Sequence, residues 1–358
     1  MKSAAIKLAC AAVVAFAALL GAPAIAPAFQ NVTIENGTLR ITGDAGKTTD
    51  LVTIKYDPVA DEYVITHDIL SAPPGCHFEG NGPPYKLLRC PAKGIGLIVV
   101  DTGNDSDTFR LEDMVYTNLN QEGIWYPPDL LEVVILMGTG NDKYQEITVA
   151  PPTLPPAAAL AKRSIDMGGG NDGAVVGPGA NKVVFGDGSA KLAVAAGTNT
   201  IAVGAGNSKV ELAGGVNSVT VGPGNSQVTA TDGTNNVSFG SGASKFTGGP
   251  GADVAVFGPG TGTFTGNGGD DRAFFGPGVN HFYGGPGADF ASLGPGNDFG
   301  FGGTGADKLL GGPGIDRLFG GADFDVLNGG PGKPDRCYGG AGGAKPISCE
   351  FGVQYMPY

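Results

Sequence analysis

The stretch GGPGADFAS-LGPGNDFGF-GGTGADKLL-GGPGIDRLF, residues 284–319, decides the fold. Its four blocks follow the nine-residue pattern GGxGxDxUx, in which U is apolar, and this pattern is typical of a parallel β-helix. A nine-residue frame that starts at Met167 continues through nineteen consecutive blocks to Cys337, with no insertion or deletion. The 64 glycines of the 358-residue chain are therefore explained by the turns of a repeat.

Each position of the block has a physical role. Glycine at positions 2 and 4 can adopt a positive φ, so the backbone can turn tightly and direct its carbonyl oxygens inward toward a cation. Position 6 supplies a carboxylate. The last three residues form a short strand, in which position 8 and position 1 of the next block face inward. Two blocks then close one coil of 18 residues. We expect an all-β fold, a parallel β-roll (β-solenoid) of such coils, preceded by an irregular β-rich N-terminal region.

Alternate blocks place their sixth residues in two rows. One row reads Asn181, Asn199, Asn217, Asn235, Asp253, Asp271, Asp289, Asp307 and Asp325. The other reads Asp172, Ala190, Ser208, Ser226, Ser244, Gly262, Asn280, Asp298, Asp316 and Pro334. Only one edge of the roll is therefore continuously acidic. The core follows the same alternation, with Ala255, Ala273 and Ala291 on one side and Phe264 and Phe282 on the other.

Residues 176–247 lack aspartate at position 6, and we place no calcium there. The stacked asparagines of this stretch are expected to form a neutral amide ladder along the axis. The division that follows is a signal peptide at 1–28, an irregular β-rich region at 29–166, a metal-poor solenoid at 167–247, a calcium-binding roll at 248–337 and a C-terminal cap at 338–358.

Residues 29–166 carry alternating strand patterns such as TLRIT and IGLIVV. Three degenerate repeats, TGNDSDTF (102–109), MGTGNDKY (137–144) and MGGGNDGA (167–174), are separated by insertions. We interpret this half as an irregular start of the same solenoid, and a separate β-sandwich is the alternative. Calcium at Asp105, Asp107 and Asp142 is left open.

The N-terminus resembles a secretory signal peptide, because Lys2 and Lys7 precede an apolar run that ends in small residues at an Ala-x-Ala site. Outside the cell, an even number of cysteines suggests disulfides, and the four cysteines after the leader form two close pairs, Cys76 with Cys90 and Cys337 with Cys349. The net charge of −12 argues against a nucleic-acid partner.

Residues 248–337 resemble the RTX, or hemolysin-type, calcium-binding repeats. The resemblance implies a right-handed β-roll with Ca²⁺ held between the turns of successive coils, by aspartates and by carbonyl groups of the glycine-rich loops. The implied ligands are Asp253, Asp271, Asp289, Asp307 and Asp325 on one edge, Asp298 and Asp316 on the other, and Gly249, Gly251, Gly285, Gly287, Gly303, Gly305, Gly312 and Gly314. The ending YGGAGGAKPISCE resembles that of Sec-exported members, in which the last two cysteines would clamp the final coil.

These observations predict a secreted, non-enzymatic protein that folds or stiffens on binding extracellular Ca²⁺. The three histidines, His67, His77 and His281, belong to no catalytic motif. The alternatives are a calcium-stiffened surface adhesin or envelope-associated spacer, with a cell-wall or surface partner, and a polysaccharide-active enzyme. No segment after the leader predicts stable membrane insertion.

Overall fold

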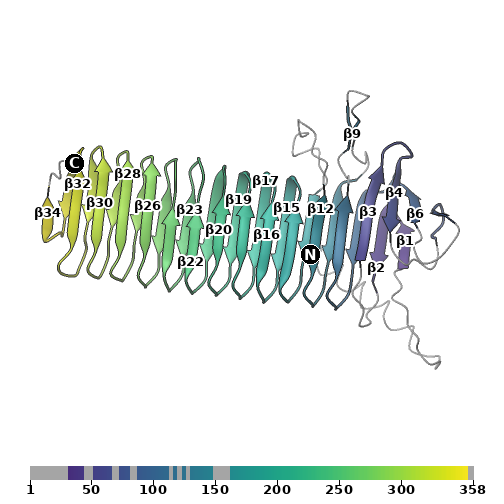
Figure 1. Ribbon diagram of the computed structural model, residues 1–358, viewed down its shortest axis with the longest axis horizontal. Helices are drawn as coiled ribbons and strands as arrows, with labels where there is room; N and C mark the ends of the chain where they lie inside the picture. The colour runs from purple at the N-terminus through teal and green to yellow at the C-terminus, as the bar shows by residue number, and fades with distance from the viewer. Residues whose placement is uncertain are drawn as a thin grey trace.

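A computed structural model describes residues 31–43, 51–66, 72–80, 87–112, 116–118, 123–125, 130–147 and 162–353. These residues form strands and turns without a helix, stacked into one long rod (Figure 1). In this part of the chain no helix is long and apolar enough to cross a membrane. The expected signal peptide, His67 and the last five residues of the expected cap lie outside the described residues.

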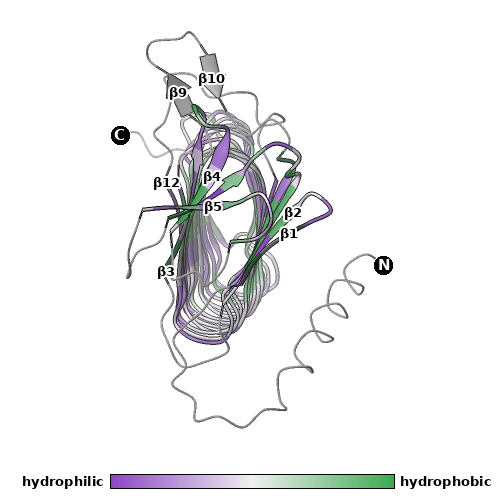
Figure 2. Cartoon of the chain, turned by 90° about the vertical axis from the view of Figure 1, so that its right-hand side faces the viewer, coloured by the Kyte–Doolittle hydropathy of each residue, from purple (hydrophilic) through white to green (hydrophobic). Residues whose placement is uncertain are grey.

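Two long sheets form opposite walls of the rod, as a view along the stack of coils shows (Figure 2). In order across the first sheet, the strands are β1 (Asn31–Glu35), β2 (Thr38–Thr42), β7 (Leu97–Asp101), β11 (Glu132–Leu136), β13 (Lys162–Asp166), β15 (Gly179–Phe185), β17 (Gly197–Val203), β19 (Gly215–Val221), β21 (Thr234–Phe239), β23 (Val254–Phe257), β25 (Arg272–Phe275), β27 (Phe290–Ser292), β29 (Lys308–Leu310), β31 (Asp325–Asn328) and β33 (Ala344–Ile347).

The second sheet carries the other strands of the rod, which alternate along the chain with those of the first sheet from β7 onward. They are β5 (His77–Glu79), β6 (Leu87–Pro91), β4 (Glu62–Thr66), β3 (Leu51–Asp57), β8 (Thr108–Glu112), β12 (Lys143–Ile147), β14 (Asp172–Val176), β16 (Ala190–Val194), β18 (Lys209–Leu212), β20 (Gln227–Ala230), β22 (Ser244–Thr247), β24 (Gly262–Thr265), β26 (His281–Pro286), β28 (Phe299–Thr304), β30 (Arg317–Ala322), β32 (Arg336–Gly340) and β34 (Phe351–Val353). A separate antiparallel pair joins β9 (Tyr116–Asn118) to β10 (Gly123–Trp125).

From β14 onward, parallel pairing at a separation of 18 residues is the rule. The register Ala255↔Ala273↔Ala291 in the first sheet faces Phe246↔Phe264↔Phe282 in the second sheet. All six of these side chains are buried, and the phenylalanine rings stack at 5.3 Å between centroids. The predicted parallel β-roll, with a thin core in which small residues oppose large ones, is therefore confirmed.

The prediction of an unbroken nine-residue frame to Cys337 is wrong in the last block. Strand β32 pairs with β30 at a separation of 19 residues, as in Leu318↔Cys337, so the final turn contains one extra residue. Asp335 therefore occupies position 6 in place of Pro334. The physical reason is that the N–H group at this position donates a hydrogen bond to the next coil, as Asp335 does, and proline has no N–H.

The N-terminal half continues the same two sheets. Strands β2, β7, β11, β13 and β15 are parallel neighbours, although the number of residues between successive strands varies. Antiparallel hairpins formed by β1 with β2 and by β3, β4, β5 and β6 end the stack. No separate sandwich is seen in the described residues of this half. Both expected disulfides, Cys76–Cys90 and Cys337–Cys349, are present.

Candidate metal sites along the turns

The first aspartate row comprises Asp253, Asp271, Asp289, Asp307 and Asp325. Each lies where the chain enters a strand of the first sheet, from β23 to β31. One carboxylate oxygen, Oδ1, accepts a hydrogen bond from the backbone N–H of the equivalent residue in the preceding coil, at 2.8 to 2.9 Å. These bonds hold the five carboxylates in a single file along one edge of the rod.

The other oxygen of each carboxylate, Oδ2, is buried and has no hydrogen-bond partner. It lies against the glycine five residues earlier, at position 1 of the same block. A Cβ added to Gly266, for example, would overlap Oδ2 of Asp271 and lie 2.5 Å from the carbonyl oxygen of Gly284 in the next coil. A carboxylate oxygen and a carbonyl oxygen of the next coil therefore lie close together beside position 1, in an arrangement that a side chain at that position would displace.

Sequence reasoning missed these position 1 glycines. They are Gly248, Gly266, Gly284, Gly302, Gly311, Gly320 and Gly329. A signal was available, because position 1 is otherwise a larger residue such as Phe257 or Leu293. Among the glycines predicted as ligands, Gly251, Gly285, Gly287, Gly303, Gly305, Gly312 and Gly314 have the expected positive φ. Gly249 does not, which corrects the expectation of a left-handed turn at that residue.

The second aspartate row comprises Asp298, Asp316 and Asp335, at the starts of β28, β30 and β32. The same N–H to Oδ1 hydrogen bonds connect them at 2.9 Å, and each has a buried Oδ2 without a hydrogen-bond partner. Asp335 was missed because the extra residue in its turn shifts it out of the nine-residue frame. A shift of one residue in the last block would have found it.

Three further carboxylates, Asp107, Asp142 and Asp172, form an N-terminal row on the edge of the second row. Backbone N–H groups of Asp107 and Asp142 donate to Oδ1 of Asp142 and Asp172, both at 2.8 Å. Oδ2 of Asp142 is buried without a hydrogen-bond partner. Asp105 lies in the turn before Asp107 and outside this file. The structure therefore brings together two of the three residues for which calcium was left open.

The expected asparagine ladder is present on the edge of the first row, where it precedes the aspartates. Amide groups of Asn181, Asn199, Asn217 and Asn235 are linked by side-chain hydrogen bonds of 2.7 to 2.8 Å. The last amide donates to Oδ1 of Asp253 at 2.8 Å, so the ladder ends on the first carboxylate. Apart from Oδ1 of Asn181, which is buried without a hydrogen-bond partner, these neutral amides are hydrogen-bonded along the ladder, and they carry no charge for a cation to neutralise.

Burial raises the pKa of the row carboxyl groups, because a charge is costly to remove from water. The pKa is raised to about 8 for Asp271, to about 7 for Asp298 and Asp307, and to about 6 for Asp253, Asp289, Asp316 and Asp325. For Asp271 the negative charges of Asp289 and Asp253 add to the effect of burial. Without a cation, ionising these carboxyl groups is therefore less favourable than in water, and the charges that form near neutral pH lie buried beside one another.

The donor set fits Ca²⁺. The rows offer carboxylate and carbonyl oxygens, which are the ligands that Ca²⁺ prefers. In the described residues, no three acidic, histidine or cysteine side chains converge on one point, so a bound ion must take most of its ligands from the backbone. The buried Oδ2 atoms beside the position 1 glycines, with the carbonyl group of the next coil, would hold it.

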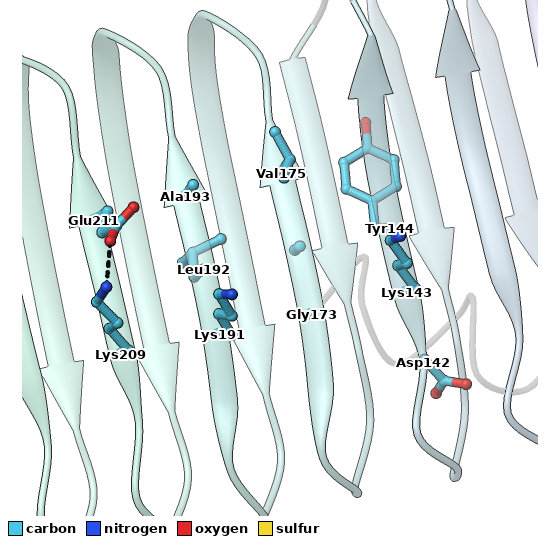
Figure 3. A pocket seen from close by; sticks show the side chains of 11 residues that line it. Asp142, Lys143, Tyr144, Gly173, Val175, Lys191, Leu192, Ala193, Lys209 and Glu211 are labelled. Carbon is cyan, nitrogen blue, oxygen red and sulfur yellow. Dashed lines mark ion pairs between the residues drawn. The ribbon is translucent and has the colours of Figure 1, made fainter.

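A separate groove lies on the outer face of the second sheet (Figure 3). Lys191, Lys209 and Glu211 project from β16 and β18, and Lys209 and Glu211 form an ion pair at 2.7 Å. Asp142 lines the groove at the turn, below the lysines. The groove therefore reaches the carboxylate edge at Asp142 and otherwise lies on the outer face.

The fold and its edges define a class, a parallel β-roll whose turns stack buried carboxylates along the axis. The family model described as the RTX calcium-binding nonapeptide repeat matches four segments, residues 195–228, 258–290, 276–309 and 310–343. The chain therefore carries RTX-type repeats, and repeats of this kind bind Ca²⁺. The first matched segment contains no aspartate, so the match there reflects the glycine pattern. Comparison with curated proteins and with solved structures gives no match.

Proposed function

We propose that this protein is a secreted, non-enzymatic calcium-binding protein whose C-terminal roll folds or rigidifies when it meets extracellular Ca²⁺. The observation that carries the proposal is the set of eight buried carboxylate oxygens without a hydrogen-bond partner in the first and second aspartate rows. Export is supported by the leader-like N-terminus and by the two disulfides, since RTX repeats typically occur in exported proteins.

Electrostatic repulsion opposes folding of the metal-free rows. Neighbouring strands are about 4.8 Å apart, and two unit charges at that distance repel by roughly 3 kcal/mol at an effective dielectric constant near 20. A Ca²⁺ ion between two coils replaces this repulsion with attraction to both carboxylates. The ion therefore links coils that would otherwise push one another apart.

Calcium binding at several sites can decide whether the roll folds. An ion present at tenfold over its dissociation constant stabilises the folded state by about 1.4 kcal/mol per site. The four gaps of the first row and the two gaps of the second would together contribute about 8 kcal/mol, which is similar to the stability of a whole domain. Extracellular calcium modules bind at about 10⁻⁴ to 10⁻³ M, so the roll would be loose before export and ordered after it.

Hydrogen exchange of the full chain with and without calcium tests this proposal. We expect chelation to remove amide protection over residues 248–337 and to leave residues 181–239 protected, because the amide ladder needs no ion. Equal protection of residues 248–337 in both conditions would contradict calcium-dependent folding.

The adhesin alternative is favoured by an aromatic file on the outer face of the second sheet. Tyr283, Phe299, Phe319 and Tyr338 lie ring to ring, with centroids 4.7 to 5.6 Å apart, and Tyr283 is 40% exposed. Exposed rings supply contact area for a partner at low entropic cost. Calcium-dependent binding of the purified protein to cell-wall polymers would favour the adhesin. Calcium-dependent ordering without such binding would favour the calcium binder alone.

A further inference from the structure

We infer that the C-terminal cap completes one additional calcium site, in which Glu350 and the carbonyl group of Ser348 stand where a further repeat would place its aspartate and glycine. The inference rests on the proposed calcium function. Neither residue belongs to a nine-residue block, and both lie beyond the four segments that match the repeat family.

The carboxylate of Glu350 takes the structural place of a row aspartate. Its Oε2 accepts a hydrogen bond from the backbone N–H of Asp335 at 2.9 Å. The corresponding bond in the second row, from the N–H of Asp316 to Oδ1 of Asp335, is also 2.9 Å. The longer side chain of glutamate therefore reaches the position that the coil geometry prepares for an aspartate.

The carbonyl group of Ser348 takes the place of a position 1 glycine carbonyl. A Cβ added to Gly329 would lie 2.5 Å from the Ser348 oxygen, as one on Gly311 would lie 2.5 Å from the oxygen of Gly329. Ser348 adopts a φ of 51°, in the left-handed region that non-glycine residues rarely occupy. The cap thus adopts an unusual backbone conformation at the residue whose carbonyl group imitates the repeat.

The space between these groups contains a carboxylate oxygen that needs a partner. Asp335 is 0% exposed, and its Oδ2 has no hydrogen-bond partner. The same Cβ on Gly329 would lie 2.8 Å from this oxygen. Asp335, Ser348 and Glu350 therefore supply oxygen ligands from two sides of one gap, the donor type that Ca²⁺ requires.

The Cys337–Cys349 disulfide holds the cap in this position. Cys337 lies in β32, two residues after Asp335, and Cys349 directly precedes Glu350. Without this bond, hydrogen bonds, short strands and the ion pair of Glu350 with Lys333, at 3.7 Å, would still hold Glu350 near the last coil, but the terminal site would lose its covalent constraint. The site is therefore expected to be complete only in the oxidised protein.

Calcium stoichiometry of the full oxidised chain tests the inference, measured by isothermal titration calorimetry and by equilibrium dialysis. We expect Glu350→Gln to bind one ion fewer than the wild type, or to bind that ion at least tenfold more weakly, because glutamine keeps the hydrogen-bond acceptor and loses the charge. Glu211→Gln, which makes the same charge change on the outer face, should match the wild type. The double variant Cys337→Ser/Cys349→Ser should lose the same single ion.

Hydrogen exchange over residues 329–353 provides a readout apart from stoichiometry, with calcium-dependent protection expected in the wild type and reduced in Glu350→Gln. An unchanged ion count and unchanged affinities in Glu350→Gln would overturn the terminal site. A wild-type chain that binds no calcium would instead overturn the proposed function itself, so the two failures are distinguishable.

Discussion

At the scale of single residues, the two oxygens of each row aspartate have different partners. Oδ1 of Asp289 accepts the backbone N–H of Asp271, whereas its Oδ2 is buried beside Gly284 without a hydrogen-bond partner. One oxygen therefore maintains the spacing of the coils, and the other is available for a cation. The glycine is as necessary as the aspartate, because any side chain at its position would fill the same space.

The substitution Asp289→Asn separates these two contributions. Asparagine can still accept the N–H of Asp271, but it cannot contribute a negative charge to an ion. We expect the calcium-free protein to become more stable, because a buried charge is removed, and the calcium-loaded protein to become less stable by about 1 to 3 kcal/mol. Thermal unfolding in chelator and in calcium measures both values.

The exposed Asp270 in the preceding coil provides a comparison, since Asp270→Asn keeps the acceptor for the backbone N–H of Ala288 and removes a nearby negative charge without removing an oxygen of the row. Its two unfolding temperatures should change little. A loss of stability in chelator for Asp289→Asn would show that this carboxylate stabilises the roll without calcium.

At the scale of elements, two types of side chain occupy position 6 along the first sheet, asparagine in the earlier coils and aspartate in the later ones. Asn181 to Asn235 link β15, β17, β19 and β21 by neutral amide bonds, and the aspartates link β23 to β31 at the same position of the coil. Asn235 connects the two, because its amide donates to Asp253. Along this edge, the rod thus passes from amide side chains that are hydrogen-bonded to one another to carboxylates that each keep one oxygen without a hydrogen-bond partner.

The substitution Asn217→Asp tests whether a carboxylate alone makes a calcium site. Aspartate cannot donate to Oδ1 of Asn235, and position 1 of its block is Leu212 rather than glycine. We expect destabilisation by about 1 to 3 kcal/mol that calcium does not reverse. The measurement is chemical unfolding with and without calcium, and Asn217→Gln controls for side-chain length. Full rescue by calcium would show that the position 1 glycine is dispensable.

At the scale of the whole molecule, stability should depend on pH in opposite ways with and without calcium. In the metal-free protein, burial raises the pKa of the row carboxyl groups from 3.8 to between about 6 and about 8. A raised folded-state pKa favours the protonated form, so this stability is fully present below pH 3.8 and is lost as the pH rises through the folded values.

Unfolding temperatures in chelator should therefore fall between pH 5 and pH 8. With calcium they should rise over the same interval, because ion binding requires deprotonated carboxylates and releases protons. Differential scanning calorimetry at constant ionic strength measures both trends. Parallel trends in chelator and in calcium would contradict the role of the rows as ion ligands.

Most of the roll could be predicted from local periodicity, since the 18-residue coil brings position 6 of alternate blocks into register wherever the frame is unbroken. The files of Asp253 to Asp325 and of Asn181 to Asn235 required no knowledge of distant contacts. Asp335 could not be assigned in this way, because an extra residue in one turn shifts the frame while hydrogen bonding between coils restores the register. The repeats around Asp107, Asp142 and Asp172 could be recognised from the sequence, but the period between them is broken by insertions, so only the structure shows that these three carboxylates share one file. Periodicity therefore predicts the regular coil. The contacts of Gly329 with the carbonyl group of Ser348 and of Asp335 with Glu350 join residues outside the repeat pattern, so only the tertiary structure decides them.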